Sequence, residues 1–308
     1  MSGEDRPGDR GAQQGPTRSR AATEERSGSR RNRERPPAPE PLPHPVVDNH
    51  CHLYIADSEG EWFATRDALA ASAAVGVPRI VQIGCDLPGA RWAVEAAAEH
   101  PQIVAGVALH PNEAPRLAAA GQLEAAYDEI EALARHDRVR AVGETGLDRF
   151  RTGEDGRAAQ EESFRWHLDL AKRLGKTLVI HDRDAHEDVL RVIDSEGAPD
   201  RWVMHCFSGD ALFARACLDR GAHLSFAGTV TFKNADPLRE ALALAPQDRV
   251  LVETDAPYLT PVPYRGRPNA SYLVPLTVRT MAEVRGEDLG DLCRAIDSNT
   301  EVAFGGHW

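Results

Sequence analysis

The chain has 308 residues and a formal net charge of −12, and 42% of its residues are hydrophobic while 27% are charged. These proportions are typical of a globular protein, and no apolar run approaches the about 18 residues of a membrane span, so we expect no membrane association. The acidic balance argues against non-specific binding of duplex DNA through a basic surface. The five cysteines form no CxxC pair, which argues against a disulfide framework and favours a reducing, cytoplasmic location.

The first 44 residues differ in composition from the rest of the chain. They are rich in Gly, Arg, Ser, Pro and Glu and contain almost no large apolar side chain. Such a segment cannot bury enough apolar surface to offset the entropy that ordering costs. We therefore expect a disordered polar tail over residues 1–44 and one folded domain over residues 45–308.

From residue 45 onward, short runs rich in Val and Ile alternate with Ala-rich and Leu-rich stretches of helical spacing. Strands are expected at residues 46–48, 79–83, 103–108, 139–143, 177–180, 202–204, 223–226 and 249–252. Helices are expected near residues 65–75, 89–99, 117–136, 158–174, 184–195, 210–220 and 235–244, with two more near 272–284 and 287–303. Eight strands, each followed by a helix, predict the α/β class and a (β/α)8 TIM barrel. A doubly wound open sheet is the alternative.

Histidines and acidic residues follow five of the predicted strands at their carboxyl ends. These residues are His50 and His52 after the first strand, Glu144 after the fourth, His181 after the fifth, His205 after the sixth and Asp255 after the eighth. In a (β/α)8 barrel all these ends face the same mouth. Imidazoles and carboxylates suit Mg, Mn or Zn, and six ligands exceed what one tetrahedral ion needs. The sequence therefore predicts a site for two divalent metal cations, about 3.5–4 Å apart.

Three further residues lie at or near the ends of predicted strands. His110 ends the third strand and could line the mouth, but we do not predict it as a ligand. Glu253 has apolar neighbours and alternates with the ligand positions, which favours a barrel-interior acid behind the ligands. Asp48 points the same way as His50 and His52 by alternation, so it either orients a ligand imidazole or lines the mouth beneath the ions.

Seven motifs in chain order resemble the TatD family of metal-dependent DNases. They are DNHCHL at 48–53, GVALHP at 106–111, VGETGLD at 142–148, IHDRDA at 180–185, HCFSG at 205–209, GTVTFK at 228–233 and ETDAPYLTPVPYRG at 253–266. The resemblance implies an amidohydrolase-like barrel that binds two divalent cations and cleaves phosphodiester bonds in DNA, often as a 3′–5′ exonuclease. It also implies that His50, His52 and Asp255 hold one cation, that His181 and His205 hold the other, and that Glu144 bridges them.

The expected reaction is hydrolysis of DNA by a metal-activated water, with Asp255 and Glu144 as the catalytic residues. Asp255 is the candidate to accept the proton of the water. Arg183, Lys233 and Arg265 are candidates to neutralise phosphates of the substrate, and Ser208 is placed in a turn where a phosphate could rest at the following helix. Because the body of the chain is acidic, we expect single-stranded DNA or frayed ends to be preferred, and no protein partner is indicated.

Two alternatives use the same cluster. The first is a binuclear hydrolase of C–N or ester bonds in small molecules, which the absence of a Lys at the end of the fifth strand disfavours modestly. The second is a non-enzymatic binding module stabilised by metal. Structural metal sites are normally closed by four ligands, so an open set of six fits this alternative poorly.

Overall fold

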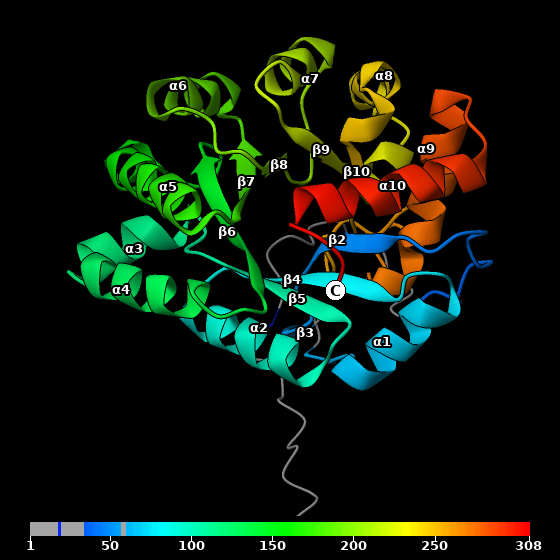
Figure 1. The fold of residues 1–308 in the computed structure, drawn as a ribbon, viewed down its shortest axis with the longest axis horizontal. Helices are drawn as coiled ribbons and strands as arrows, with labels where there is room; N and C mark the ends of the chain where they lie inside the picture. The colour runs from blue at the N-terminus through cyan, green and yellow to red at the C-terminus, as the bar shows by residue number, and fades with distance from the viewer. Residues whose placement is uncertain (1–17, 20–33, 57–59) are drawn as a thin grey trace, which may run out of the picture.

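The computed structural model describes residues 18–19, 34–56 and 60–308. Eight parallel strands follow one another around a ring (Figure 1): β2 Val47–Cys51, β4 Arg79–Gly84, β5 Ile103–Val107, β6 Val139–Asp148, β7 Thr177–Arg183, β8 Trp202–Met204, β9 His223–Phe226 and β10 Val250–Val252. The first and last strands meet through a parallel bridge between Cys51 and Ala256. The expected (β/α)8 barrel is confirmed.

Helices cover the outside of the strands: α1 Thr65–Ala74, α2 Leu87–Glu99, α3 Glu113–Ala119, α4 Leu123–Ala134, α5 Glu154–Leu174, α6 His186–Glu196, α7 Ala211–Leu218, α8 Asp236–Leu244, α9 Val274–Arg285 and α10 Leu289–Ala303. Two details differ from the sequence prediction. The helix expected over 117–136 is two helices, α3 and α4, because Gly121 adopts a φ of +66° between them. Strands β2, β6 and β7 also run further than expected, to Cys51, Asp148 and Arg183.

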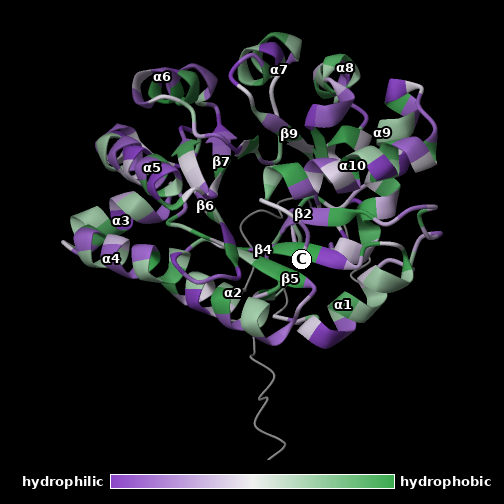
Figure 2. Ribbon diagram, in the orientation of Figure 1, coloured by the Kyte–Doolittle hydropathy of each residue, from purple (hydrophilic) through white to green (hydrophobic). Residues whose placement is uncertain are grey.

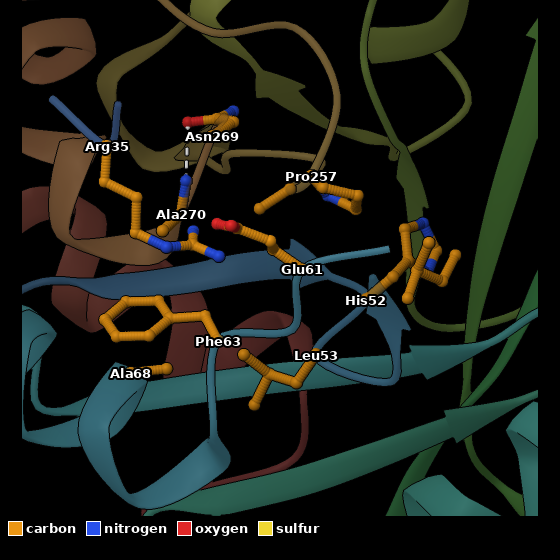
Figure 3. Close-up of a pocket in the computed structure, with 11 residues that line it drawn as sticks. Arg35, His52, Leu53, Glu61, Phe63, Ala68, Pro257, Asn269 and Ala270 are labelled. Atoms are coloured by element: carbon orange, nitrogen blue, oxygen red, sulfur yellow. Dashed lines mark hydrogen bonds between the residues drawn. The ribbon is translucent and has the colours of Figure 1, made fainter. Parts of the chain in front are cut away.

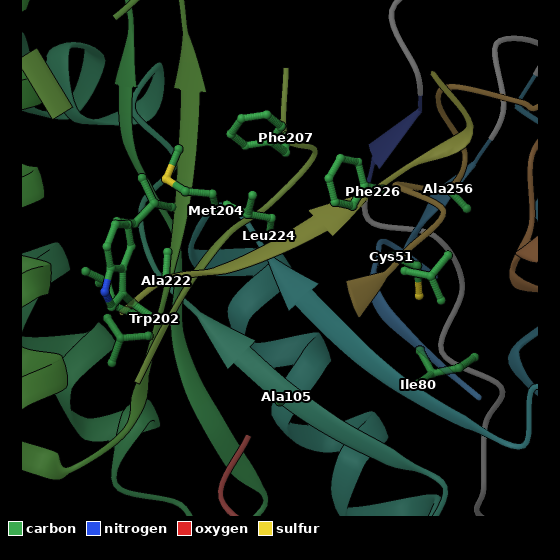
Figure 4. Close-up of a cluster of buried hydrophobic side chains, with 14 of the residues drawn as sticks. Cys51, Ile80, Ala105, Trp202, Met204, Phe207, Ala222, Leu224, Phe226 and Ala256 are labelled. Atoms are coloured by element: carbon green, nitrogen blue, oxygen red, sulfur yellow. The ribbon is translucent and has the colours of Figure 1, made fainter. Parts of the chain in front are cut away.

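The buried apolar side chains form an inner and an outer layer. In β8, Val203 belongs to the cluster inside the barrel, while Trp202 and Met204 point outward against the helices (Figure 4). This alternation follows from the period of two of a β-strand. Hydrophobic and hydrophilic residues alternate along the helices that cover the strands, as expected for helices with one buried and one exposed face (Figure 2).

The C-terminal residues seal the barrel at the end opposite the carboxyl ends of the strands. Phe304 is 1% exposed and belongs to the inner cluster, against which Trp308 packs. The Trp308 indole donates to the carbonyl of Gln102, and the guanidinium of Arg79 lies 4.9 Å from the Trp308 ring. One end of the barrel is thus filled, which leaves the carboxyl-terminal mouth for chemistry.

Part of the predicted tail is ordered. The prediction for residues 1–17 and 20–33 lies outside the described residues, but residues 34–44 lie against the barrel, so the disorder predicted there is wrong. Arg267 donates to the carbonyl of Arg35 at 2.9 Å, and the Tyr272 hydroxyl donates to the carbonyl of Pro36 at 2.6 Å. Side chains of the barrel therefore hold the backbone of this segment, which its own composition does not reveal. A short strand β1 (Arg18–Ser19) also pairs with β3 (Ile55–Ala56).

None of the helices in the described segments combines the length and the hydrophobicity that crossing a bilayer requires.

Replacement of Phe304 by Ala should lower the free energy of unfolding by about 3–5 kcal/mol, because it removes a large buried side chain and leaves a cavity. Urea unfolding followed by circular dichroism measures the change. Val302→Ala is the control, because Val302 is 58% exposed at the end of α10, the helix that Phe304 follows, and its change should stay within about 0.5 kcal/mol. Equal effects of the two substitutions would show that Phe304 does not support the barrel.

Candidate metal centre

The structure brings all six predicted ligands together at the carboxyl-terminal mouth. They come from β2 (His50), the residue after β2 (His52), β6 (Glu144), β7 (His181), the residue after β8 (His205) and the segment after β10 (Asp255). The pairing of β6 with β7 is irregular between Val142 and Thr145, and Glu144 lies at this irregularity.

Glu144 occupies the centre of the cluster, and its two carboxylate oxygens face different imidazoles. Oε2 lies 3.4 Å from Nε2 of His50 and 3.8 Å from Nε2 of His52. Oε1 lies 2.7 Å from Nδ1 of His181 and 3.2 Å from Nε2 of His205. One carboxylate thus separates the histidines into two sets.

The first set is the more compact. Nε2 of His50 and Nε2 of His52 are 3.3 Å apart, and Oδ1 of Asp255 lies 3.3 Å from Nε2 of His52 and 3.9 Å from that of His50. These three atoms lie close enough for one ion to contact all of them.

Contacts behind the histidines fix which ring nitrogen faces the cluster. Nδ1 of His52 donates to the carbonyl of Ile83 at 2.9 Å, and Nδ1 of His205 donates to Oε1 of Glu253 at 3.0 Å. A proton on Nδ1 leaves the lone pair of Nε2 directed at the other ligands, which is the arrangement that metal-binding histidines require. Glu253 also accepts from the backbone N–H of Cys206. Glu253 therefore lies behind His205, where the sequence analysis expected it.

The charges of the cluster also fit a cation. Within the described part of the chain, the recorded ion-pair partners of Glu144 and Asp255 are histidines. Burial would raise the pKa of Glu144, but His205 and other nearby imidazoles outweigh it and hold this pKa well below its ordinary value. Buried carboxylates without Lys or Arg partners need a positive charge from protonated imidazoles or a metal, and divalent cations supply it with a matching ligand set.

His110 joins the cluster, although we did not predict it as a ligand. Its Nε2 lies 3.3 Å from Oε1 of Glu144, and its Nδ1 accepts from the backbone N–H of Asn112 at 3.0 Å. Because Nδ1 accepts, the proton of the neutral ring is on Nε2, so His110 faces the mouth as a hydrogen-bond donor rather than as a metal ligand. Its place just beyond the end of the third strand was the signal in the sequence.

Cys85 is a further residue that the sequence analysis did not select. It follows β4, is buried, and donates its thiol to Oε2 of Glu144 at an S–O distance of 3.3 Å. The thiol therefore helps to fix the oxygen of Glu144 that faces His50 and His52.

Asp48 binds the last strand end rather than a ligand imidazole. Its carboxylate accepts from the Thr254 backbone N–H at 2.9 Å and from the Thr254 hydroxyl at 2.6 Å. Burial raises the pKa of Asp48 to about 6, although the hydrogen bonds from Thr254 oppose this rise. Of the two roles considered for Asp48, orientation of an imidazole is not supported, and its effect on the ligands is indirect.

The predicted substrate contacts lie outside this cluster. Arg183 stacks on Phe150 with its guanidinium carbon 4.0 Å from the ring centre, and Arg265 stacks on Phe232 at 4.3 Å. Lys233 and Ser208 are exposed.

The helix after Ser208 is already occupied at its first turn. The Asp210 carboxylate accepts from the backbone N–H groups of Leu212 and Phe213 at the start of α7. A phosphate would be repelled there, so the expectation of a phosphate at this helix is not supported.

A (β/α)8 barrel with this cluster at its mouth defines the class of the protein as a metal-dependent hydrolase. The sequence model of the family described as TatD related DNase matches residues 47–305. The chain is 46% identical to the uncharacterized metal-dependent hydrolase TatD of Mycobacterium tuberculosis, over 85% of this chain and 99% of that protein. It is 36% identical to the uncharacterized metal-dependent hydrolase YcfH of Escherichia coli K12, over 84% of this chain and 95% of that protein.

A solved structure agrees with these sequence matches. The crystal structure of YJJV, a TatD homolog from Escherichia coli K12, gives a TM-score of 0.76 at 25% identity and covers 85% of this chain and 98% of that one. The chain belongs to the TatD family.

Replacement of Glu253 by Gln should weaken metal binding by about 10–100-fold, because His205 loses the charged partner that orients it. Titration of metal-free protein with Zn²⁺ or Mn²⁺ in a calorimeter measures the affinity. Glu240→Gln, an exposed position on α8, is the matched control and should bind as the wild type does. Unchanged affinity in Glu253→Gln would argue against His205 as a ligand.

The buried His167 predicts a pH dependence of stability. Its Nδ1 donates to the carbonyl of Ser163 at 2.7 Å, and its Nε2 accepts from the N–H of Leu109 at 3.1 Å. The second hydrogen bond holds the backbone of the residue that precedes His110. Burial lowers the pKa of His167 to about 4. The unfolded chain takes up this proton near pH 6.5, before the folded chain does, so stability is intact above that pH and falls as the pH drops towards 4.

The contribution of His167 to this loss should be roughly 3 kcal/mol between pH 6.5 and pH 4. Urea unfolding at a series of pH values compares the wild type with His167→Gln, whose amide can accept from Leu109 without titrating. Other groups titrate equally in both proteins, so the difference isolates His167. An identical pH slope in the two proteins would contradict the prediction.

Proposed function

We propose that this metal-dependent hydrolase cleaves phosphodiester bonds in DNA, as a 3′–5′ exodeoxyribonuclease that prefers single strands. The observation that carries the proposal is the position of the Glu144 carboxylate, whose two oxygens face two separate sets of imidazoles. A carboxylate so placed can bridge two cations, and paired cations suit the attacking and leaving oxygens of a displacement at phosphorus.

In this proposal, His50, His52 and Asp255 would hold one cation, His181 and His205 would hold the second, and Glu144 would be shared between them. The bound cations would lower the pKa of water to about 7 and offset the negative charge of the phosphodiester. Asp255 is partly exposed and lies beside His52, where it can accept the proton of the attacking water. His110 can donate from Nε2 to an oxygen of the scissile phosphate.

The rim supplies the contacts to the rest of the substrate. Arg183 and Arg265 are each held against an aromatic ring, which leaves the guanidinium edges for phosphates on either side of the scissile bond. Phe150 is 64% exposed beneath Arg183 and can stack on a splayed base. Exposed Lys233 and Ser208 add further polar contacts. Scattered cations over an acidic body favour single strands and frayed ends over long duplex.

The cleavage reaction can be tested with a single-stranded DNA oligonucleotide in the presence of Mg²⁺ or Mn²⁺. A 5′-labelled strand should shorten stepwise, a 3′-labelled strand should release its label at once, and a chelator should abolish both. Asp255→Asn should lower the rate by about 10²–10⁴-fold, since it removes the proton acceptor and a metal ligand. Asp248→Asn, an exposed position before β10, makes the same change outside the site and should leave the rate unchanged.

The other outcomes separate the alternatives. Faster degradation of blunt duplex than of single strands would contradict the strand preference. Failure of a metal-loaded preparation to cleave DNA, with hydrolysis of a lactone or cyclic amide instead, would assign the site to small-molecule C–N or ester bonds. Failure on all these substrates would favour the metal-stabilised binding module.

A further inference from the structure

A pocket opens beside the metal centre, between the end of β2, the segment before α1 and the loop after β10 (Figure 3). His52 lines this pocket and also belongs to the metal cluster, so the two sites are continuous. The walls are largely apolar and include Leu53, Phe63 and Pro257. Two charged side chains, Arg35 and Glu61, complete the lining.

Arg35 reaches the pocket because the segment 34–44 runs alongside α1 in the same direction, with its first residues beside the start of the helix. Near the closed end of the barrel, the Leu42 N–H donates to the carbonyl of Val75, just beyond the end of α1. Near the mouth, the guanidinium carbon of Arg35 lies 4.4 Å from the ring centre of Phe63, just before α1 begins. The segment thus runs from the mouth, where Arg35 lies, to the closed end of the barrel, where Leu42 lies.

The position of Arg35 is fixed by the barrel. Arg267 donates to the carbonyls of Glu34 at 2.7 Å and of Arg35 at 2.9 Å. The guanidinium of Arg35 stacks on the ring of Phe63. The family match begins at residue 47, so Arg35 lies outside the part of the chain that the family model covers. The arginine is therefore a preorganised addition by this chain to the mouth of the barrel.

The chemistry of the lining selects the ligand. Arg35 and Glu61 point toward one another within the pocket, so hydrogen-bond donors and acceptors stand side by side (Figure 3). A bare phosphate would be repelled by the carboxylate of Glu61. A nucleobase suits both parts of the pocket, because its faces are apolar and its edge carries donors and acceptors. The Watson–Crick edge of guanine combines the acceptor O6 with two donors, N1–H and the amino group.

We propose that this pocket binds a nucleobase of the nucleotide next to the phosphate being cleaved. Arg35 and Glu61 contact the edge of the base, and the apolar walls contact its face. The shared wall at His52 places the sugar phosphate of that nucleotide at the metal centre. This inference rests on the proposed function, to which it adds a recognised group and a residue that confers specificity.

Calorimetric titration of the metal-loaded protein with 2′-deoxyguanosine 5′-monophosphate tests the pocket, and 2-deoxyribose 5-phosphate serves as the probe without a base. Arg35→Gln should weaken binding of the nucleotide roughly tenfold, as expected for loss of a charge-assisted hydrogen bond, and should leave binding of the sugar phosphate unchanged. Arg66→Gln removes the same charge from an exposed position on α1 that does not line the pocket, and it should bind both probes as the wild type does.

Equal nucleotide binding by the wild type and Arg35→Gln would overturn the base pocket. Equal weakening for both probes would also overturn it, because Arg35 would then act on the phosphate or on the metal centre. These titrations involve no hydrolysis, so they are independent of the cleavage assay. Arg35-dependent nucleotide binding without DNA cleavage would overturn the proposed nuclease function alone, and cleavage with Arg35-independent binding would overturn the pocket alone.

Discussion

The contact between the first and last strands is the constraint on which the metal centre depends. The buried Asp48 carboxylate in the first barrel strand binds Thr254, just after the last strand, and accepts from both its backbone N–H and its hydroxyl. Next to this contact, the Asp255 N–H donates to the carbonyl of His50 at 2.9 Å. Closure of the barrel therefore brings His50, His52 and Asp255 into one cluster, because the ligands sit directly beside the hydrogen bonds that close it.

The arrangement around Glu144 illustrates how a buried charge is tolerated when it serves chemistry. A carboxylate this deep would be costly without partners, yet its partners here are imidazoles that can give up their protons to make room for metal. The contacts of His52 with Ile83 and of His205 with Glu253 keep the lone pairs aimed inward. The site is thus organised before metal arrives, and the cost of its buried acids is offset by the cation that they bind.

The two ends of the barrel have separate tasks. At one end, Phe304 and the residues after it fill the interior and contribute stability. At the other end, loops and the ordered segment 34–44 surround the metal centre with Arg–aromatic pairs. Because these rim residues carry little of the core, they can differ between relatives of one barrel while the ligands stay the same. We therefore expect the rim residues to determine the choice of substrate. Among them, Arg35 lies outside the part of the chain that the family model covers.

The sequence by itself determined the barrel and the six candidate ligands at its mouth. Strand and helix periodicity is local, and the carboxyl ends of parallel barrel strands meet at one mouth whatever the details of packing. Only the tertiary structure decided that Asp48 holds Thr254, that His110 faces Glu144 with its proton on Nε2, and that residues 34–44 are ordered. Each of these depends on a hydrogen bond to a particular backbone or side-chain group, often far along the chain, and such contacts leave no periodic signal in the sequence.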